Sequence, residues 1–269
     1  METPGEKLAL FRERRNLAAV QPQGPLALVN TQWIDMEQTV WGVPGVWAPR
    51  EGLSGLQLTA SAEDGITVDG EPVEGTVDVR AKGTEDPSDV VFSDTQVGHV
   101  IAQGDSHALR VWDSNSEGIQ AFGHIDAFDY APEWVITGSW QEIPGGKSVG
   151  FEHLKDEGVS RDEVIPGEIT INHDGQEYTL AAFKAGRALQ LVFADATNDV
   201  STYSVGRFLF VAPNPDGTIT LDFNLAVLPP CAFSYAFNCP LPPAQNRFPF
   251  PIEAGEKNVM KSDGSLLHG

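Results

Sequence analysis

Cysteine, positive charge and long apolar runs are all scarce in this chain of 269 residues. Its two cysteines are too few for the disulfide framework of a secreted protein, which favours a reducing compartment. No apolar run approaches the roughly 18 residues that a membrane helix needs. The first residues, METPGEKLALFRERRNLAAV, lack the unbroken apolar core of a signal peptide. We therefore predict a soluble cytoplasmic protein that does not interact with membranes.

The charge of the chain is strongly one-sided. Seventeen lysines and arginines stand against 38 aspartates and glutamates, giving a net charge of −21. A negative field of this size repels the phosphate backbone of nucleic acids, so we predict no nucleic-acid partner. The charge also keeps a protein soluble without any specific role. Nothing in the composition indicates the oligomeric state.

The N-terminal segment is predicted to be a helix, and the rest of the chain to be β-structure. Thr3, Pro4 and Glu6 have the spacing of a helix start with a capping box. Beyond residue 25 the apolar residues alternate with a period of two, and Asp69-Gly70 and Asp174-Gly175 are typical hairpin turns. This pattern predicts an all-β antiparallel barrel or sandwich with an N-terminal helical arm.

Four segments follow from these patterns. We predict a helical arm at residues 1–24, an N-terminal β module at 25–130 and a C-terminal antiparallel β domain at 131–257, followed by a frayed tail at 258–269. A polar, acidic loop is expected at 145–161. Gly146–Gly150 inside it fits the G-x-S-x-G pattern, but no helix pattern follows the serine, so we do not assign a nucleophile there.

Residues 206–224 have the alternation of a β-hairpin closed by the loop at 212–217. Pairing Val211 with Thr218 places Arg207 opposite Asp222 on one face. The other, core-facing side then carries Phe208, Phe210, Ile219 and Leu221. If the charged face lines a cavity, Arg207 is a clamp for carboxylate or phosphate, and if it faces solvent, the two form a surface ion pair.

The segment from Leu221 to Lys257 combines both cysteines with seven of the 19 prolines. Residues 228–251 are predicted to form an ordered proline-rich strap, with apolar anchors at Phe233, Tyr235, Phe237, Leu241, Phe248 and Phe250. The whole segment resembles the C-terminal signature of the bacterial and archaeal family known as domain of unknown function 1684. The matching pieces are Asp195–Asn198, Thr202-Tyr203, Gly206–Leu209, Asp222–Asn224, Pro229–Phe233, Cys239–Pro243, Asn246-Arg247 and Ala254–Lys257. Because that family is uncharacterised, the resemblance implies no activity. It adds weight to the cavity, since Arg207 and Asp222 both fall in its motifs.

Two functional hypotheses remain open. In the first, which we favour, polar side chains form a pocket for a small polar or anionic molecule, with or without a reaction. The pocket candidates are Tyr203, Arg207, Asp222, Asn224, Asn246, Arg247 and Cys231. In the second, these residues tie the proline-rich segment to the sheet of a non-catalytic structural or protein-interaction module. The chain has no nucleophile–base motif that names a reaction.

We predict no cofactor and no bound metal. The seven residues between Cys231 and Cys239 exceed the two to four of a zinc knuckle. Buried free thiols are the expected state of the two cysteines, with a disulfide or a nucleophilic cysteine as alternatives. Asp195 and Asp199 follow a strong strand in a predicted turn, where such side chains usually bind their own backbone. A ligand or metal role for these two aspartates is the alternative.

Overall fold

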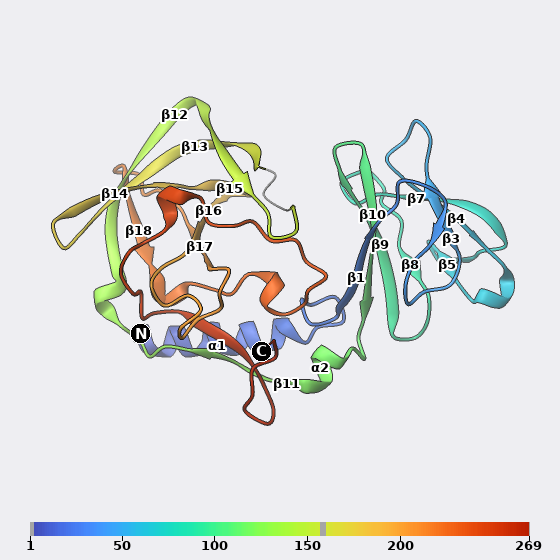
Figure 1. Ribbon diagram of the computed structural model, residues 1–269, viewed down its shortest axis with the longest axis horizontal. Coiled ribbons are helices and arrows are strands. Elements are labelled where there is room, and N and C mark those ends of the chain that lie inside the picture. The colour runs from blue at the N-terminus through green and yellow to red at the C-terminus, as the bar shows by residue number, and fades with distance from the viewer. Residues whose placement is uncertain (1–2, 157–159, 269) are drawn as a thin grey trace. The chain divides into compact units, whose positions relative to one another are not determined.

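The computed structural model describes residues 3–156 and 160–268 (Figure 1). Most of this chain is antiparallel β-sheet, and one long helix stands at the N-terminus, which confirms the predicted fold class. The chain divides into two compact units. Unit 1 contains residues 1–16 and 122–269, and unit 2 contains residues 17–121. That residues 25–130 and 131–257 form separate domains remains a prediction. Within the described residues, we find no helix with the length and apolar composition to cross a membrane.

Helix α1 (Pro4–Ala19) begins with the predicted capping box. The Glu6 carboxylate accepts a hydrogen bond from the backbone N–H of Thr3 (2.7 Å), and the Thr3 hydroxyl accepts one from the Glu6 N–H (3.2 Å). This reciprocal pair satisfies donors that the first helical turn leaves unpaired. Farther along α1, Arg15 forms a two-point ion pair with Glu256, at 2.7 and 3.0 Å.

Unit 2 is a sandwich of two antiparallel sheets. One sheet has the order β1-β10-β9-β8-β5-β6 and the other β2-β3-β4-β7. A single apolar cluster draws on both sheets, including the fully buried Trp47 of β3 and Leu109 of β10. The elements are β1 (Leu28–Trp33), β2 (Gln38–Thr39), β3 (Val46–Pro49), β4 (Gly55–Ala60), η1 (Ala62–Asp64), β5 (Thr67–Val68), β6 (Glu71–Pro72), β7 (Gly75–Arg80), β8 (Val90–Val91), β9 (Gln96–Gln103), β10 (Ser106–Asp113) and α2 (Glu117–Ala121).

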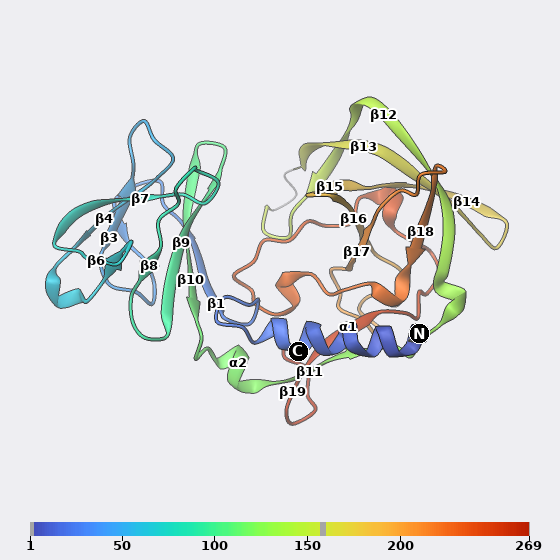
Figure 2. The same cartoon turned by 180° about the vertical axis from the view of Figure 1, so that it is seen from behind.

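Unit 1 packs a four-stranded sheet, β14-β13-β12-β18, and a three-stranded sheet, β15-β16-β17, around a shared apolar core. Figure 2 shows β12 and β18 side by side. The elements are β11 (Phe122–Ala127), η2 (Pro132–Trp134), β12 (Val135–Glu152), β13 (Ser160–His173), β14 (Gln176–Ala181), β15 (Phe183–Ala185), β16 (Ala188–Phe193), β17 (Arg207–Val211), β18 (Thr218–Asp222), η3 (Phe223–Leu225), η4 (Pro230–Ala232), η5 (Ala244–Asn246) and β19 (Glu256–Lys261).

The proline-rich segment, which we call the strap (residues 228–251), is ordered against this core. It contains the short turns η4 and η5, and its residues next to Arg247 pair with the end of β16: the Ala194 N–H donates to Asn246 (3.1 Å) and the Phe248 N–H donates to Ala194 (2.8 Å). Phe233 and Phe248 are buried, as expected of anchors. Tyr235 differs from that expectation because it is 64% exposed.

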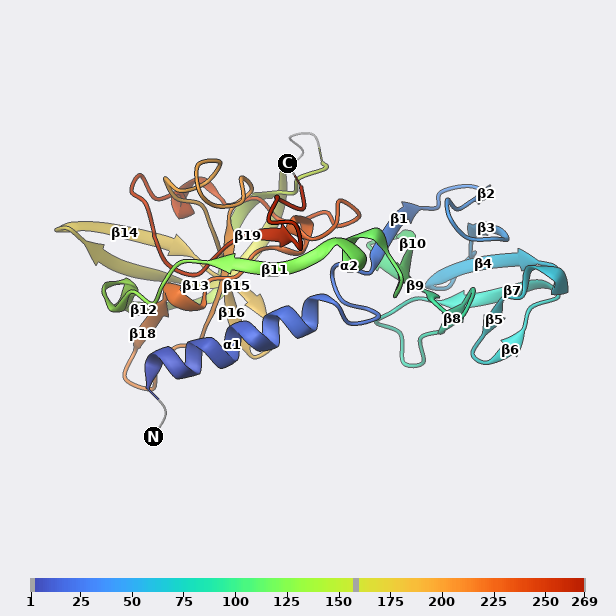
Figure 3. The same ribbon diagram turned by 90° about the horizontal axis from the view of Figure 1, so that it is seen from below.

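Two predicted irregular segments are β-strands instead. The polar loop expected at 145–161 is mostly the distal part of β12 and the start of β13, where Lys147–Glu152 pairs with Ser160–Ile165. The sequence pattern did not reveal this pair of strands, because polar residues stand on both of its faces. The expected tail begins with β19, which pairs with β11 beside α1 (Figure 3). Residues 157–159 of the predicted loop and Gly269 of the predicted tail lie outside the described residues.

Candidate functional site

Arg207 begins β17, and its side chain is fully buried. One terminal nitrogen, Nη2, lies 2.7 Å from Oδ2 of Asp195 and donates to the carbonyl of Ile252 at 2.8 Å. The other, Nη1, donates to the carbonyls of Ala254 and Glu256. The guanidinium therefore joins the end of the core sheet to the chain that follows the strap. Nε has no hydrogen-bond partner among the described residues, and the group lies over the ring of Phe193.

Burial lowers the pKa of Arg207, while the charge of Asp195 and its hydrogen bond act in the opposite direction. The Asp195 carboxylate is itself saturated with donors. Its Oδ1 accepts from the N–H of Thr197 (2.9 Å) and from the N–H of Ile252 (3.1 Å). Asp195 thus binds its own turn, as expected, and also the buried arginine, which the sequence did not indicate.

The predicted pairing of Arg207 with Asp222 is wrong. Strand β17 pairs with β16, placing Arg207 opposite Phe193, and β18 pairs with β12, placing Asp222 opposite Val135. Asp222 instead caps η3, where its Oδ1 accepts from the N–H of Asn224 at 3.1 Å. Phe208, Ile219 and Leu221 are buried as predicted, but Phe210 is 51% exposed.

Asn224 and Asn246 bind backbone groups as a neighbouring strand would. Asn224 exchanges two hydrogen bonds with the backbone of Ala131, at 2.8 and 2.9 Å. Asn246 accepts from the N–H of Ala181 (2.8 Å) and donates to the carbonyls of Ala181 and Val192. Arg247 is exposed, and its position in the fold is fixed through its backbone. These groups connect segments of unit 1 to one another.

A hollow of about 410 Å³ opens on unit 1 beside Tyr203. Of the seven predicted site residues, all of which the structure describes, Tyr203 alone lines it. The rings of Tyr235 and His268 pack together at its rim, with centroids 4.1 Å apart. The remaining lining residues are Leu154, Asp199, Val200, Ser201, Thr202, Ser204, Val205, Asn258 and Leu266.

Sequence reasoning missed most of this hollow. The sequence pattern predicted that Tyr235 is a buried anchor of the strap and that His268 belongs to a frayed tail, so neither was a candidate for a site. His268 Nε2 is buried and has no hydrogen-bond partner among the described residues, and burial lowers the pKa of this histidine. The C-terminal residues reach this place because β19 pairs with β11 and the chain then folds back, with the Leu267 N–H donating to Val259 at 2.8 Å.

The two cysteines belong to a buried cluster against which Tyr203 packs. The Tyr203 hydroxyl donates a hydrogen bond to the Cys231 carbonyl (3.1 Å). Both cysteines are buried free thiols. The Cys231 N–H donates to the sulphur of Cys239 at 3.1 Å. Hydrogen bonding by the Cys239 thiol, and less strongly by Tyr203, lowers the pKa of Cys231 against the opposing effect of burial. Burial raises the pKa of Tyr203, which keeps its hydroxyl protonated.

Unit 2 has a second hollow of about 390 Å³, lined by Arg50, Ser54 and His107 among others. Ser54 Oγ lies 3.1 Å from His107 Nε2, which is the spacing of a nucleophile and a base. Arg50 is already paired with Asp78 at 2.8 Å. No sequence motif links these residues, since Ser54 and His107 are 53 positions apart.

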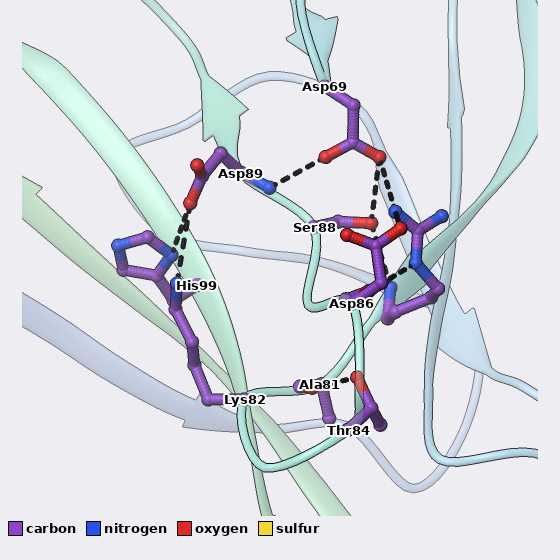
Figure 4. Close-up of polar contacts among 9 residues, drawn as sticks. Asp69, Ala81, Lys82, Thr84, Asp86, Ser88, Asp89 and His99 are labelled. Atoms are coloured by element: carbon purple, nitrogen blue, oxygen red, sulfur yellow. Dashed lines mark hydrogen bonds and ion pairs between the residues drawn. The ribbon is translucent and has the colours of Figure 1, made fainter.

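A polar network elsewhere in unit 2 holds the loop at 84–89 in place (Figure 4). Asp69 accepts from Arg80 Nη2 (2.9 Å), from the Ser88 hydroxyl (3.1 Å) and from the Asp89 N–H (2.9 Å). On the other side of the loop, Asp89 lies 3.4 Å from Nδ1 of His99. These contacts bind the loop to Asp69, Arg80 and His99, which indicates a structural role. Over residues 3–156 and 160–268, no group of three or more histidines, cysteines or acids is arranged to hold a metal ion.

Comparison with known proteins identifies a family without a described function. The model of the family "Protein of unknown function (DUF1684)" matches residues 120–257, just over half of the chain. The chain therefore belongs to this family. It is 30% identical to an uncharacterized protein from Haloarcula marismortui with a solution NMR structure; the match covers 51% of this chain and 77% of that one, with a TM-score of 0.42. No curated protein matches the chain significantly.

Proposed function

We propose that this member of the DUF1684 family binds a small polar molecule in the hollow beside Tyr203. One observation carries the proposal: four exposed large apolar side chains surround this one depression. Leu154 is 40% exposed, Leu266 43%, Tyr235 64% and Val200 84%. Exposed apolar side chains that gather at one place indicate a binding site, whereas singly scattered ones are common on any surface. The volume of about 410 Å³ suits a small ligand, because such sites span roughly 300–1,000 Å³.

The lining favours a neutral or cationic ligand with a flat apolar part. It contains the carboxylate of Asp199 and the hydroxyls of Ser201 and Ser204, whereas its described residues include neither lysine nor arginine. The net charge of −21 adds to this preference. An anionic ligand, which the sequence left open, would need a cation such as Arg207, and that side chain is fully buried in contacts of its own. The aromatic pair Tyr235–His268 offers a surface for stacking.

The signature residues support this proposal indirectly. Arg207 binds the backbone that follows the strap, Asn246 binds the strap itself to β16, and the strap carries Tyr235 to the rim of the hollow. In this account the buried polar groups position the site and do not touch the ligand. The proposal includes no reaction, and it places the protein in the cytoplasm, without a nucleic-acid partner, on the grounds of its charge and its free thiols.

The experiment compares three probes of one shape and different charge: benzamidine, benzamide and benzoate. Titrations are followed by backbone amide NMR of the full chain. We expect shifts concentrated at residues 199–205 and 258, largest for benzamidine and smallest for benzoate. The Tyr235→Ala variant should lose them. Tyr130→Ala, which removes an exposed tyrosine that does not line the hollow, should keep them.

The proposal fails if millimolar probes leave these amides unmoved, if benzoate binds best, or if Tyr235→Ala binds like the wild type. Concentration-dependent broadening of the same amides without any probe would instead favour the protein-interaction alternative. The exposed apolar rim would then be a contact surface for a second protein molecule.

A further inference from the structure

Cys231 and Cys239 are held next to each other by a folded turn of the strap. The Phe233 N–H donates to Pro230 (3.0 Å), and the Phe237 N–H donates to Ser234 (3.3 Å), so the chain between the cysteines doubles back. The backbone nitrogen of Cys231 lies 3.1 Å from the Cys239 sulphur, to which its N–H donates. Both sulphurs belong to one buried apolar cluster of unit 1. The Cys239 sulphur therefore contacts the backbone of Cys231 and also hydrogen-bonds its thiol, so the two sulphurs need little movement to form a bond.

We propose that Cys231 and Cys239 form a peroxide-sensitive dithiol that closes reversibly into an intramolecular disulfide. Structural thiols in a core are usually dispersed and inert, whereas redox-sensing cysteines have a second cysteine within reach. Here the pairing is exclusive, since these are the two cysteines of the whole chain. Disulfides of cytosolic proteins are mostly transient in this way.

Access for a small oxidant follows from the position of Tyr203. Cys231 is fully buried and Cys239 is 3% exposed, so a bulky oxidant cannot reach them in the folded chain. Tyr203 lines the hollow on one side and donates its hydroxyl to the Cys231 carbonyl on the other. Displacement of this one ring opens a path from the hollow for a molecule as small as hydrogen peroxide. We therefore assign Cys231 as the sulphur that reacts first.

The chemistry balances with hydrogen peroxide as the only oxidant. The Cys231 thiolate attacks one peroxide oxygen, the O–O bond breaks, and the hydroxide that leaves takes up a proton as water. Cys231 is now a sulfenic acid. The Cys239 sulphur attacks the Cys231 sulphur, the S–O bond breaks, and the oxygen leaves as a second water with the proton of Cys239. Two thiols and one peroxide thus become one disulfide and two waters. A thiol reductant reverses the change by exchange.

The hydrogen bonds around Cys231 support its role as the attacking thiol. Hydrogen bonding by the Cys239 thiol, then by Tyr203, lowers the pKa of Cys231, which raises the fraction of thiolate at a given pH. Tyr203→Phe keeps the ring and removes the hydroxyl. We expect the pH profile of the oxidation rate to move to higher pH in this variant. An unchanged profile would remove Tyr203 from the proposal as a positioning residue.

The main test uses the reduced wild-type chain and hydrogen peroxide, without any ligand of the hollow. After treatment the protein is unfolded, alkylated and weighed by mass spectrometry. We expect a chain lighter by about 2 Da, with neither cysteine alkylated, and full recovery of both thiols with dithiothreitol. Oxidation of the same chain in urea should give a smaller share of disulfide and a larger share of masses increased by oxygen, because the folded turn that holds the sulphurs together is then lost.

Three results would overturn the proposal: both thiols still alkylated after peroxide, masses increased by oxygen atoms, or disulfide-linked dimers. Cys231→Ser and Cys239→Ser serve as controls, since each must abolish the mass decrease. Their circular dichroism is compared with that of the wild type, and the wild-type result stands even if a variant fails to fold. Because no ligand is involved, failure of this test is distinct from failure of the proposed binding function.

Discussion

Buried side-chain amides and a buried guanidinium connect distant backbone segments in unit 1. Asn246 satisfies groups of Ala181 and Val192, and Asn224 satisfies those of Ala131. A buried peptide group without a partner is costly, so each of these side chains stabilises the segment that it reaches. The sequence could predict that such polar residues are hydrogen-bonded. It could not predict their partners, because these lie 54 to 93 positions away.

His99 predicts the pH dependence of unit 2. Its Nε2 lies 3.0 Å from Gln23 Oε1, while Nδ1 faces Asp89, with Lys82 bound to the same carboxylate. Burial, and then the charge of Lys82, lowers the pKa of His99, although Asp89 opposes the shift. His99 has a pKa of about 6.5 in the unfolded chain, so below this pH the unfolded chain binds a proton that the folded chain does not bind. Stability should fall as the pH drops from 7 toward 5.

The measurement is the melting temperature across this pH range for the wild type, His99→Gln and His124→Gln. We expect the acid-induced loss to be smaller in His99→Gln and unchanged in His124→Gln, which alters an exposed histidine of unit 1. His153 and His268 also have lowered pKa values and contribute to the remaining loss. If His99→Gln melts with the wild-type pH dependence, His99 is not the group responsible.

At the scale of elements, Gly206 sets the entry into β17. Its φ is +115°, and an added Cβ would lie 2.4 Å from the Phe193 carbonyl oxygen and 2.9 Å from a ring carbon of Pro242. Gly206→Ala should therefore lower the free energy of unfolding by at least about 2 kcal/mol, through backbone strain and the clash together.

Gly217→Ala is the matched control for this substitution. Gly217 also has a positive φ, +81°, but an added Cβ would meet no atom within 4 Å. We expect a loss of about 1 kcal/mol from the backbone alone. Urea unfolding of both variants measures the difference, and equal losses would show that the close approach of β16 and the strap to Gly206 does not matter.

Strands were easier to predict than their partners. The Asp69-Gly70 and Asp174-Gly175 turns close β5–β6 and β13–β14, and both aspartates have a positive φ. The predicted hairpin at 206–224, in which β17 would pair with β18, is wrong. Alternation fixes which residues share a face but not which strand lies alongside, and proximity in sequence favoured β18 where β16 is the true partner of β17.

At the scale of the whole molecule, the charge of the helix is complementary to that of the chain that it contacts. Residues 1–24 contain four basic and three acidic residues in a chain of net charge −21. Within unit 1, Arg12 donates to the carbonyl of Phe128, and Arg15 binds Glu256, which is 2% exposed and also accepts from the Leu228 N–H. The helix, the start of the strap and β19 thus meet at one buried carboxylate.

At this scale, the buried residues of the family signature form a frame, and we propose that a ligand binds beside it. Arg207 is the centre of that frame, since its contacts with Asp195, Ile252 and Ala254 join the core sheet to the chain beyond the strap. Removing one partner of a buried ion pair typically costs about 3–5 kcal/mol. A ligand-binding arginine in an open pocket would not carry such a contribution to stability.

Hydrogen–deuterium exchange of Arg207→Met, read by mass spectrometry beside the wild type, tests this claim most directly. The control is Arg187→Met, which removes an exposed arginine at the β15–β16 turn. We predict faster exchange in β16, β17 and residues 228–256 of Arg207→Met, unchanged exchange in β9 and β10 of unit 2, and a wild-type pattern in Arg187→Met. Wild-type exchange throughout Arg207→Met would contradict the account, because the arginine would then be free to serve a ligand.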